Sequence, residues 1–216
     1  MQWALLDSLP ESDQRAVLAK CKRQRYRRGE VVFREGDIGD SVHLVAKATF
    51  AVRVSAPSGD VVTLDVLGPG DVFGEQALIG REIERSATVV ALEQAETMRL
   101  TGADFDTLLG EHPATVRLLV AMLDARLRAT SLSLLDALYL PAETRLFRQL
   151  VRLAEIYADH TSGGIPIIQD DLATLAGTTR QTVNRVLREA QDDELIRLAR
   201  GRVEVLDPVK LAHRAR

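Results

Sequence analysis

The segment Phe73–Ile79, with the sequence FGEQALI, carries groups that can bind an anion and a sugar. Gly74 lets a ligand approach the backbone, and the amides around Gln76 and Ala77, at the start of a short predicted helix, can donate hydrogen bonds to a phosphate. Glu75 can accept a hydrogen bond from a sugar hydroxyl. A lone Gly-Glu pair is uninformative, so the interpretation depends on a second segment.

That second segment is Glu84–Thr88, with the sequence ERSAT, and it supplies a cation. Arg85 can pair with a phosphate. Both segments, in this order and between predicted strands, contain the parts of a site for a nucleotide monophosphate. The sequence therefore indicates a nucleotide-binding function in the N-terminal half of the chain.

Residues 170–187 have the pattern of a helix-turn-helix. Ala173 is small where two helices cross closely, and Gly177 supplies the positive φ that the turn needs. Either Thr178 or Thr179 can cap the second helix. The residues expected to form the buried face are Leu172, Ala176, Val183 and Val186.

The second helix of this pattern leaves a polar face that suits the major groove of DNA. The residues expected there are Thr179, Arg180, Gln181, Asn184, Arg185 and Arg188. Two alternating runs follow, Leu195–Leu198 and Val203–Val205, and predict a β-hairpin wing with Arg200 and Arg202 at its tip for backbone phosphates. The alternative is that these arginines form an ordinary solvated surface.

Short β-like runs separated by turn signals position the nucleotide segments, and they predict a β-sandwich, barrel or roll. The predicted strands are Glu30–Phe33, Ser41–Val45, Phe50–Val54, Val61–Val66, Ala87–Ala91 and Glu96–Leu100.

From Glu111 to Leu138 the apolar period becomes helical. One stripe of this long helix contains Val116, Val120, Leu123, Leu127, Thr130, Leu134 and Ala137. The stripe can bury against its own domain or against a second copy of the chain, and its length and heptad-like spacing favour the second. We therefore predict a homodimer whose interface includes Val116, Val120, Leu123, Leu127 and Leu134.

Pro141 disfavours a helical conformation in the residue before it, so we expect a hinge at Leu138–Pro141. The predicted organisation is a sensor domain at residues 1–110, a dimerisation helix at 111–138 and a winged helix-turn-helix domain at 139–216. A loop is expected at Thr161–Gly164.

The composition sets limits on function. The net charge of −3 over 216 residues means that contact with DNA must be local. Cys21 is the sole cysteine, which excludes an intramolecular disulfide and a cysteine-ligated iron-sulfur cluster within one chain. The sequence shows no basic leader and no apolar run near the roughly 20 residues of a membrane span, so we expect a cytoplasmic protein with no membrane partner.

No catalytic residue and no metal site is predicted. The common hydrolase, phosphate-loop and zinc-protease motifs are absent, and the scattered histidines are expected to be ordinary surface or loop residues. They are His43, His112, His160 and His213. A turnover enzyme is therefore the weaker alternative, as is a regulatory subunit without a DNA-binding module.

Nearly the whole chain resembles the cyclic AMP receptor protein branch of the superfamily that also contains the fumarate and nitrate reduction regulators. The resemblance is carried by Arg28–Asp37, Phe73–Ala87, Arg126–Ser131 and Gly177–Arg185. It implies an α+β fold with an N-terminal antiparallel, jelly-roll-like β-roll, a long dimerisation helix and a C-terminal winged helix-turn-helix. It further implies a bacterial transcription factor that is allosterically controlled by cyclic AMP, binds pseudo-palindromic double-stranded DNA and contacts RNA polymerase.

The resemblance also assigns roles to residues of the site. Glu75 would hold the ribose 2′-OH, and Arg85 with Ser86 would hold the cyclic phosphate. The adenine would contact Thr130 and Ser131, and Arg126 joins the ligand-binding set. A threonine on an apolar stripe can instead satisfy its hydroxyl on a carbonyl one turn back.

Several positions depart from the family pattern. Gln76 replaces a usual leucine or isoleucine, and Ala48 replaces a glycine that turns between strands. Ser86 fits a reader of cyclic AMP without excluding cyclic GMP. Gln181 replaces a glutamate and favours adenine over cytosine in the operator. A regulator of the same fold with cyclic GMP, another effector or no effector stays open, whereas one cysteine and no histidine beside the cassette disfavour a redox or haem sensor.

Overall fold

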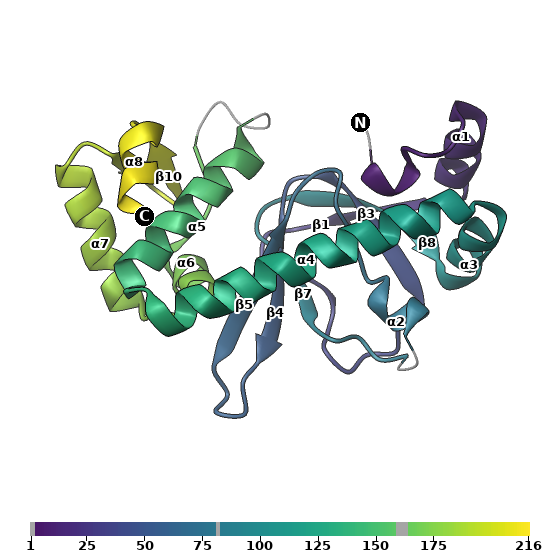
Figure 1. Ribbon diagram of the computed structural model, residues 1–216, viewed down its shortest axis with the longest axis horizontal. Helices are drawn as coiled ribbons and strands as arrows, with labels where there is room; N and C mark the ends of the chain where they lie inside the picture. Colours follow the sequence, from purple (N-terminus) through teal and green to yellow (C-terminus); the bar gives the residue numbers. More distant parts are fainter. Residues whose placement is uncertain (1–2, 81–82, 159–163) are drawn as a thin grey trace. The chain divides into compact units, whose positions relative to one another are not determined.

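The computed structural model describes residues 3–80, 83–158 and 164–216 (Figure 1). The chain divides into two compact units, each described by itself below. The first contains Met1–Val54 and Val66–Ala129, and the second contains Ser55–Asp65 and Thr130–Arg216.

The roll consists of two antiparallel sheets. Their strands are β1 (Lys22–Tyr26), β2 (Val31–Phe33), β3 (Ser41–Lys47), β4 (Phe50–Ser55), β5 (Val61–Leu67), β6 (Val72–Phe73), β7 (Thr88–Ala91) and β8 (Ala95–Thr101). One sheet has the order β1-β8-β3-β6 and the other the order β2-β7-β4-β5. The helices that accompany them are η1 (Ala4–Leu6), α1 (Glu11–Lys20), α2 (Gln76–Ile79), α3 (Gly102–Glu111) and the long α4 (Pro113–Tyr139).

Two apolar clusters hold the first unit together. One lies between the sheets, where Phe50 and Val89 meet Val45 and Phe73. The other packs the outer face of β3 and β8 against the N-terminal turn and the helices α3 and α4. Because both faces of β3 are covered, its residues are buried without a break from Ser41 to Ala46.

The six predicted strands each correspond to an observed strand, and the predicted long helix corresponds to α4. Strand β1 was not predicted, because its sequence KRQRY is polar and mostly exposed at the edge of its sheet. Helix α3 was also missed. Its signal is Thr101, whose hydroxyl accepts a hydrogen bond from the Asp104 amide and caps the helix.

The second unit contains the end of α4 and the helical module that follows it. Its further elements are α5 (Ala142–Tyr157), α6 (Gln169–Ala176), α7 (Arg180–Asp192), β9 (Ile196–Ala199), β10 (Arg202–Val205) and α8 (Pro208–Arg214). Helix α4 ends at Tyr139, and Pro141 occupies the N-cap of α5, where its fixed φ is tolerated. Residues 161–163 of the predicted loop lie outside the described residues.

Arg145 connects three parts of this module. Its Nη1 donates to the carbonyl of Leu140 at 2.8 Å, its Nε to that of Ala176 at 3.0 Å, and its Nη2 to that of Gly177 at 2.9 Å. Carbonyls at helix C-termini lack intrahelical partners. One side chain therefore satisfies the ends of both α4 and α6.

Ala48, between β3 and β4, has φ 65°, in the left-handed region where a Cβ is strained. We expect Ala48→Gly to raise the free energy of unfolding by about 0.5–1 kcal/mol, because relief of about 1–2 kcal/mol exceeds the added entropy of the unfolded glycine. Urea unfolding measures it. Ala51→Gly, within strand β4, is the matched control and is expected to destabilise. A lower stability of the Ala48 variant would contradict the assignment of strain.

Candidate nucleotide site and nucleic-acid interface

The first nucleotide segment turns sharply after β6. Gly74 has φ 87°, and a Cβ there would lie 2.7 Å from Nη1 of Arg85 and 3.0 Å from the carbonyl oxygen of Ser41. Both the backbone conformation and the lack of space require glycine. The two predicted segments are thus in direct contact, with Arg85 against the backbone of Gly74.

The side chain of Arg85 is only 3% exposed. Its Nη1 donates to the carbonyl of Gly74 at 2.7 Å, and its Nη2 donates to Ser41 Oγ at 3.3 Å and lies 3.5 Å from Asp40 Oδ1. The ring of Phe33 lies 4.1 Å from its Cζ, a cation–π distance. Burial lowers the pKa of Arg85. Its Nε is buried and has no hydrogen-bond partner in the described part of the chain.

Glu75 is the second buried charge of the site, with its side chain 2% exposed. Its Oε1 accepts a hydrogen bond from Nη1 of Arg126 at 2.7 Å, and Arg126 also donates to the carbonyl of Val72. Burial raises the pKa of Glu75, an effect that Arg126 partly offsets. Its Oε2 is buried without a hydrogen-bond partner among residues 3–80, 83–158 and 164–216.

Helix α2 is one turn long, and its first amides remain available. Within the described ranges, the backbone N–H groups of Gln76 and Ala77 donate to no backbone acceptor. The exposed Ser86 donates its hydroxyl to Oε1 of Gln76 at 2.9 Å. The structure therefore brings several hydrogen-bond donors and one carboxylate close together. The residues that supply them are Gly74, Glu75, Gln76, Ala77, Arg85, Ser86 and Arg126.

Thr130 and Ser131 are exposed on α4 and belong to the second unit. Thr130 contributes to a hollow of about 270 Å³ whose lining includes Ser133, Arg145 and Gln149.

Sequence analysis did not identify three of the side chains that contact Arg85. Asp40, Ser41 and Phe33 reach it through strand pairing, which no local pattern reveals. The prediction of His43 as a surface or loop residue is wrong, because it is 4% exposed inside β3. The available signal was its place in the run Ser41–Ala46, which is buried on both faces. Burial lowers the pKa of His43 to about 3, with Arg85 and Arg99 adding to the effect and Asp40 opposing it.

The helix-turn-helix follows the sequence prediction closely. Gly177 has φ 58° after α6, and Thr179 caps α7 by accepting a hydrogen bond from the amide of Thr182. The cap is thus Thr179 rather than Thr178. The predicted inner residues Leu172, Ala176, Val183 and Val186 are all buried.

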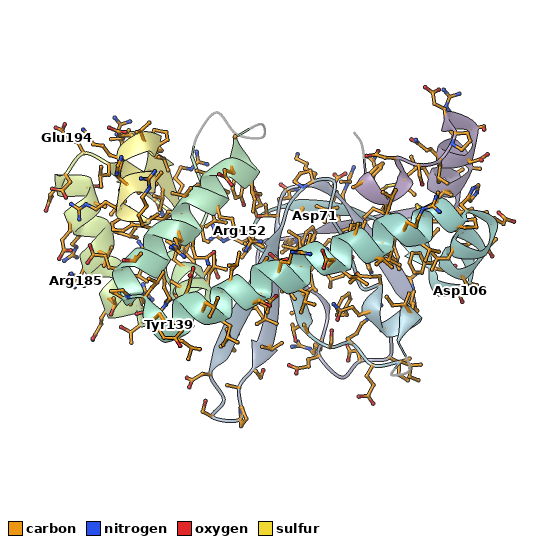
Figure 2. All side chains as sticks on the ribbon, viewed as in Figure 1. Asp71, Asp106, Tyr139, Arg152, Arg185 and Glu194 are labelled. Atoms are coloured by element: carbon orange, nitrogen blue, oxygen red, sulfur yellow. The ribbon has the colours of Figure 1, made fainter. Side chains whose placement is uncertain are left out.

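The polar face of α7 and the wing present the predicted basic residues. Arg180, Gln181, Arg185, Arg188, Arg200 and Arg202 are exposed, and Asn184 is half-buried. Arg180 pairs with Asp170 at 3.0 Å, and Arg185, which extends from α7 in Figure 2, pairs with Glu189 at 2.8 Å. These exposed pairs are weak and can exchange for DNA groups.

The stripe on α4 is divided between two environments. Val116, Val120, Leu127 and Leu134 are exposed. Leu123 is half-buried and packs against the core of its own unit, beside Leu119 and Met122.

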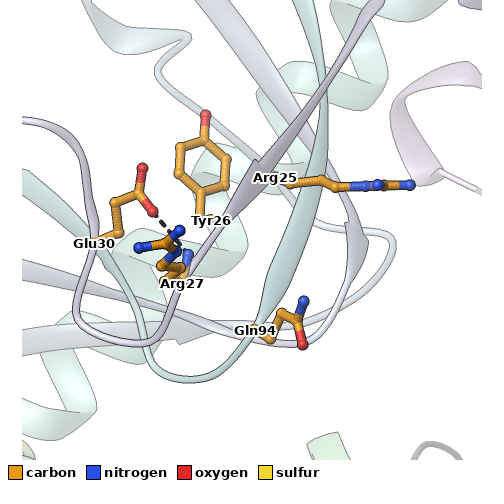
Figure 3. Close-up of a pocket in the computed structure, with 5 residues that line it drawn as sticks. All are labelled: Arg25, Tyr26, Arg27, Glu30 and Gln94. Carbon is orange, nitrogen blue, oxygen red and sulfur yellow. Dashed lines mark hydrogen bonds between the residues drawn. The ribbon is translucent and has the colours of Figure 1, made fainter.

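Another hollow, of about 490 Å³, is lined by Arg25, Tyr26, Arg27, Glu30 and Gln94 (Figure 3). Of the groups that line it, Arg25 pairs with Glu96 at 3.1 Å and Glu30 accepts the amide of Arg27 at 2.8 Å. Among the described residues, no cluster of three or more acidic, histidine or cysteine side chains is arranged to hold a metal ion. No helix in the described ranges is long and apolar enough to cross a membrane.

Comparison with known proteins decides the family. The cyclic nucleotide-binding domain model matches residues 23–112, and the Crp-like helix-turn-helix domain model matches residues 144–214. The cyclic AMP receptor protein of Thermus thermophilus is 35% identical over 198 residues, which cover 90% of this chain and 88% of that protein. The chain belongs to the cyclic AMP receptor protein family. It is a transcription regulator with a cyclic nucleotide-binding domain and a DNA-binding helix-turn-helix domain.

A further relative and two solved structures are also similar to this chain. A CRP-like cAMP-activated global transcriptional regulator of Mycobacterium tuberculosis is 30% identical over 196 residues, covering 88% of this chain and 86% of that protein. The solved catabolite activator protein of T. thermophilus is 33% identical, with 98% of both chains covered and a TM-score of 0.56. The c-di-GMP-responsive regulator CLP of Xanthomonas campestris, 22% identical with a TM-score of 0.77 over 91% of this chain and 99% of that one, shares the fold.

Membership of the cyclic AMP receptor protein family confirms the predicted resemblance and the α+β fold class. The relatives are transcription regulators and not enzymes, as the sequence led us to expect.

The buried His43 predicts an acid sensitivity. The unfolded histidine binds a proton below about 6.5, whereas the folded one stays neutral down to about 3. Between these values the unfolded state holds more protons, so the free energy of unfolding falls as the pH falls, by at most about 1.4 kcal/mol per pH unit. His43→Phe should lose this slope. Urea unfolding at pH 7 and pH 5 should show a loss roughly 2 kcal/mol smaller in the variant. Other titrating groups are common to both proteins, so equal slopes would contradict the assignment.

Proposed function

We propose that the protein is a homodimeric regulator in which cyclic AMP, bound at the cassette, controls sequence-specific binding to DNA. The main support for the effector site is a pair of buried polar atoms that have no hydrogen-bond partner among the described residues, Arg85 Nε and Glu75 Oε2. A buried polar atom without a partner costs about 1–3 kcal/mol, so a ligand that supplies both partners gains affinity. A phosphate suits the guanidinium, and a ribose hydroxyl suits the carboxylate. Gln76 and Ala77 add two amide donors.

The choice of cyclic AMP is supported by the names of the relatives at 35% and 30% identity, a cyclic AMP receptor protein and a cAMP-activated regulator. Thr130 and Ser131 would contact the adenine. Ser86 also suits cyclic GMP, and the X. campestris neighbour is described as responsive to c-di-GMP. Cyclic GMP, another effector or an empty pocket are therefore the alternatives that titration must separate.

The exposed stripe Val116, Val120, Leu127 and Leu134 supports a dimer seam along α4, to which the outer edge of Leu123 would add. Two copies would place two α7 helices on half-sites about 34 Å apart, one turn of B-DNA. The contacts would come from Thr179, Arg180, Gln181, Asn184, Arg185 and Arg188, with Arg200 and Arg202 on phosphates. Such a regulator acts in the cytoplasm and contacts RNA polymerase.

The effector site is tested by Arg85→Leu, which removes the buried cation. We expect the affinity for cyclic AMP to fall at least about 100-fold, because a charge-assisted contact is lost and Asp40 is left near the phosphate. The matched control is Arg99→Leu, which removes the other arginine that pairs with Asp40, at 2.6 Å, and should bind with nearly the wild-type affinity. Isothermal titration with cyclic AMP and cyclic GMP measures both.

Unchanged affinity in the Arg85 variant would place the phosphate elsewhere. A wild-type protein that binds neither nucleotide would refute the cyclic nucleotide as effector and favour the remaining alternatives.

Ligand and DNA should bind with positive coupling of about 5- to 150-fold, equal in both directions. Arg180→Ala should cost about 1–3 kcal/mol at one base pair of a palindromic probe and relax specificity there, because its base contact is lost. Arg202→Ala is the control, since loss of a phosphate contact weakens all sequences alike and flattens the salt dependence. Fluorescence anisotropy at fixed salt, with and without cyclic AMP, provides the data. Equal DNA affinity in both conditions would refute control by this ligand.

A further inference from the structure

His43 lies close to Arg85, in a cluster of aromatic rings. Its ring stacks on that of Phe73, with centroids 5.0 Å apart and planes 3° from parallel. The ring of Phe33 lies 6.0 Å from that of His43 and also faces the guanidinium of Arg85. Strand register fixes this position, because His43 pairs with Phe73 on β6 and with Arg99 on β8.

Both ring nitrogens of His43 face hydroxyl groups. Nδ1 lies 3.2 Å from Thr97 Oγ1, and Nε2 lies 3.4 Å from Ser41 Oγ. Thr97 and Ser41 are themselves buried. The imidazole therefore connects a hydroxyl on β8 to a hydroxyl on its own strand, with no solvent around any of the three groups.

Counting protons fixes the direction of this chain. Ser41 donates its one hydroxyl proton to Asp40 Oδ1 at 2.7 Å, so its oxygen must act as acceptor for its other neighbours. One of these is Arg85 Nη2 at 3.3 Å. The other is His43, and Ser41 accepts from it in the tautomer in which Nε2 carries the imidazole proton and Nδ1 faces the hydroxyl of Thr97. Burial and the nearby arginines keep the pKa of His43 at about 3, so the ring is neutral near pH 7.

We propose that His43 is a positioning residue for Arg85, acting through the hydroxyl of Ser41. By donating to Ser41 Oγ, the neutral ring orients the oxygen that holds Nη2, while the Gly74 carbonyl holds Nη1 at 2.7 Å. With one N–H of each terminal nitrogen engaged, Nε, which has no hydrogen-bond partner among the described residues, is a buried donor that an anion can use. This role rests on the proposed function of Arg85 and adds a residue to it that does not touch the ligand.

The test compares three substitutions of His43 in the full chain. Phe keeps the ring against Phe73 and removes both hydrogen bonds. Gln loses the ring but places an amide N–H near the position of Nε2, toward Ser41. Asn places its amide near Nδ1, toward Thr97, and leaves Ser41 without its donor.

Isothermal titration with cyclic AMP should rank the affinities as wild type, then His43→Gln, then His43→Asn and His43→Phe together. The last two should bind about tenfold more weakly than wild type, because the hydrogen bond to a charged group is no longer held in place. Rescue by Gln relative to Phe is the result that packing alone does not give, because Phe keeps the ring and Gln keeps only the hydrogen bond toward Ser41. A packing role predicts instead that Phe binds best, and wild-type affinity in His43→Phe would overturn the proposal.

A second measurement needs no ligand. Nitrogen-15 NMR on the unliganded chain reports the rotation of the Arg85 guanidinium about its Nε–Cζ bond, with Arg85→Lys used to assign the signal. We expect rotation at least about threefold faster in His43→Phe and His43→Asn than in wild type and His43→Gln, because Nη2 is held less firmly. Equal rates in all four proteins would overturn the positioning role.

The two measurements separate this proposal from the proposed function. If wild type binds no cyclic nucleotide but the rotation rates differ as expected, the effector assignment fails and the positioning of Arg85 by His43 stands. If wild type binds cyclic AMP and His43→Phe binds it equally well, the effector assignment stands and the positioning role fails.

Discussion

A guanidinium buried inside the roll is the constraint on which the sensor unit depends. Removing a cation from water costs several kcal/mol unless hydrogen bonds and charges replace the solvent. Around Arg85 the replacement comes from Phe33 on β2, Ser41 on β3 and the backbone of Gly74 after β6. These groups meet only when both sheets are formed, so the contacts that fold the roll are also the contacts that build the buried environment of Arg85.

The parts predicted well from the sequence are those in which local geometry and chemistry coincide. Gly74 and Gly177 stand where the backbone turns with positive φ, and each lies within a few residues of a segment for which the sequence predicts a function. The alternating strands and the apolar face of α7 follow from periodicity, which burial requires. The cassette and the recognition module could therefore be predicted without knowledge of the tertiary structure.

Helix α3 was missed although its cap at Thr101 is local, whereas the other misses depend on packing against distant parts of the chain. His43 is polar, and only the position of β3 between β6 and β8 encloses it. Strand β1 was missed for the opposite reason. It lies at the edge of its sheet and is mostly exposed, so its sequence has no apolar pattern. Leu123 lies on the predicted stripe, yet its side chain is half-buried and packs against the core of the first unit. In these other cases the environment is created by a partner that lies far away in the sequence.

The three carbonyls held by Arg145 give the second unit a mechanical property. The segment after α4 is only two residues long, and a hinge of that length would ordinarily let the following module pivot freely. One planar guanidinium binds the carbonyl of Leu140 together with those of Ala176 and Gly177, so the residue after α4 is tied to the end of α6 and to the turn before α7. A displacement of Leu140 is therefore opposed by three hydrogen bonds. We expect the helix-turn-helix to follow such a displacement rather than to move independently of it.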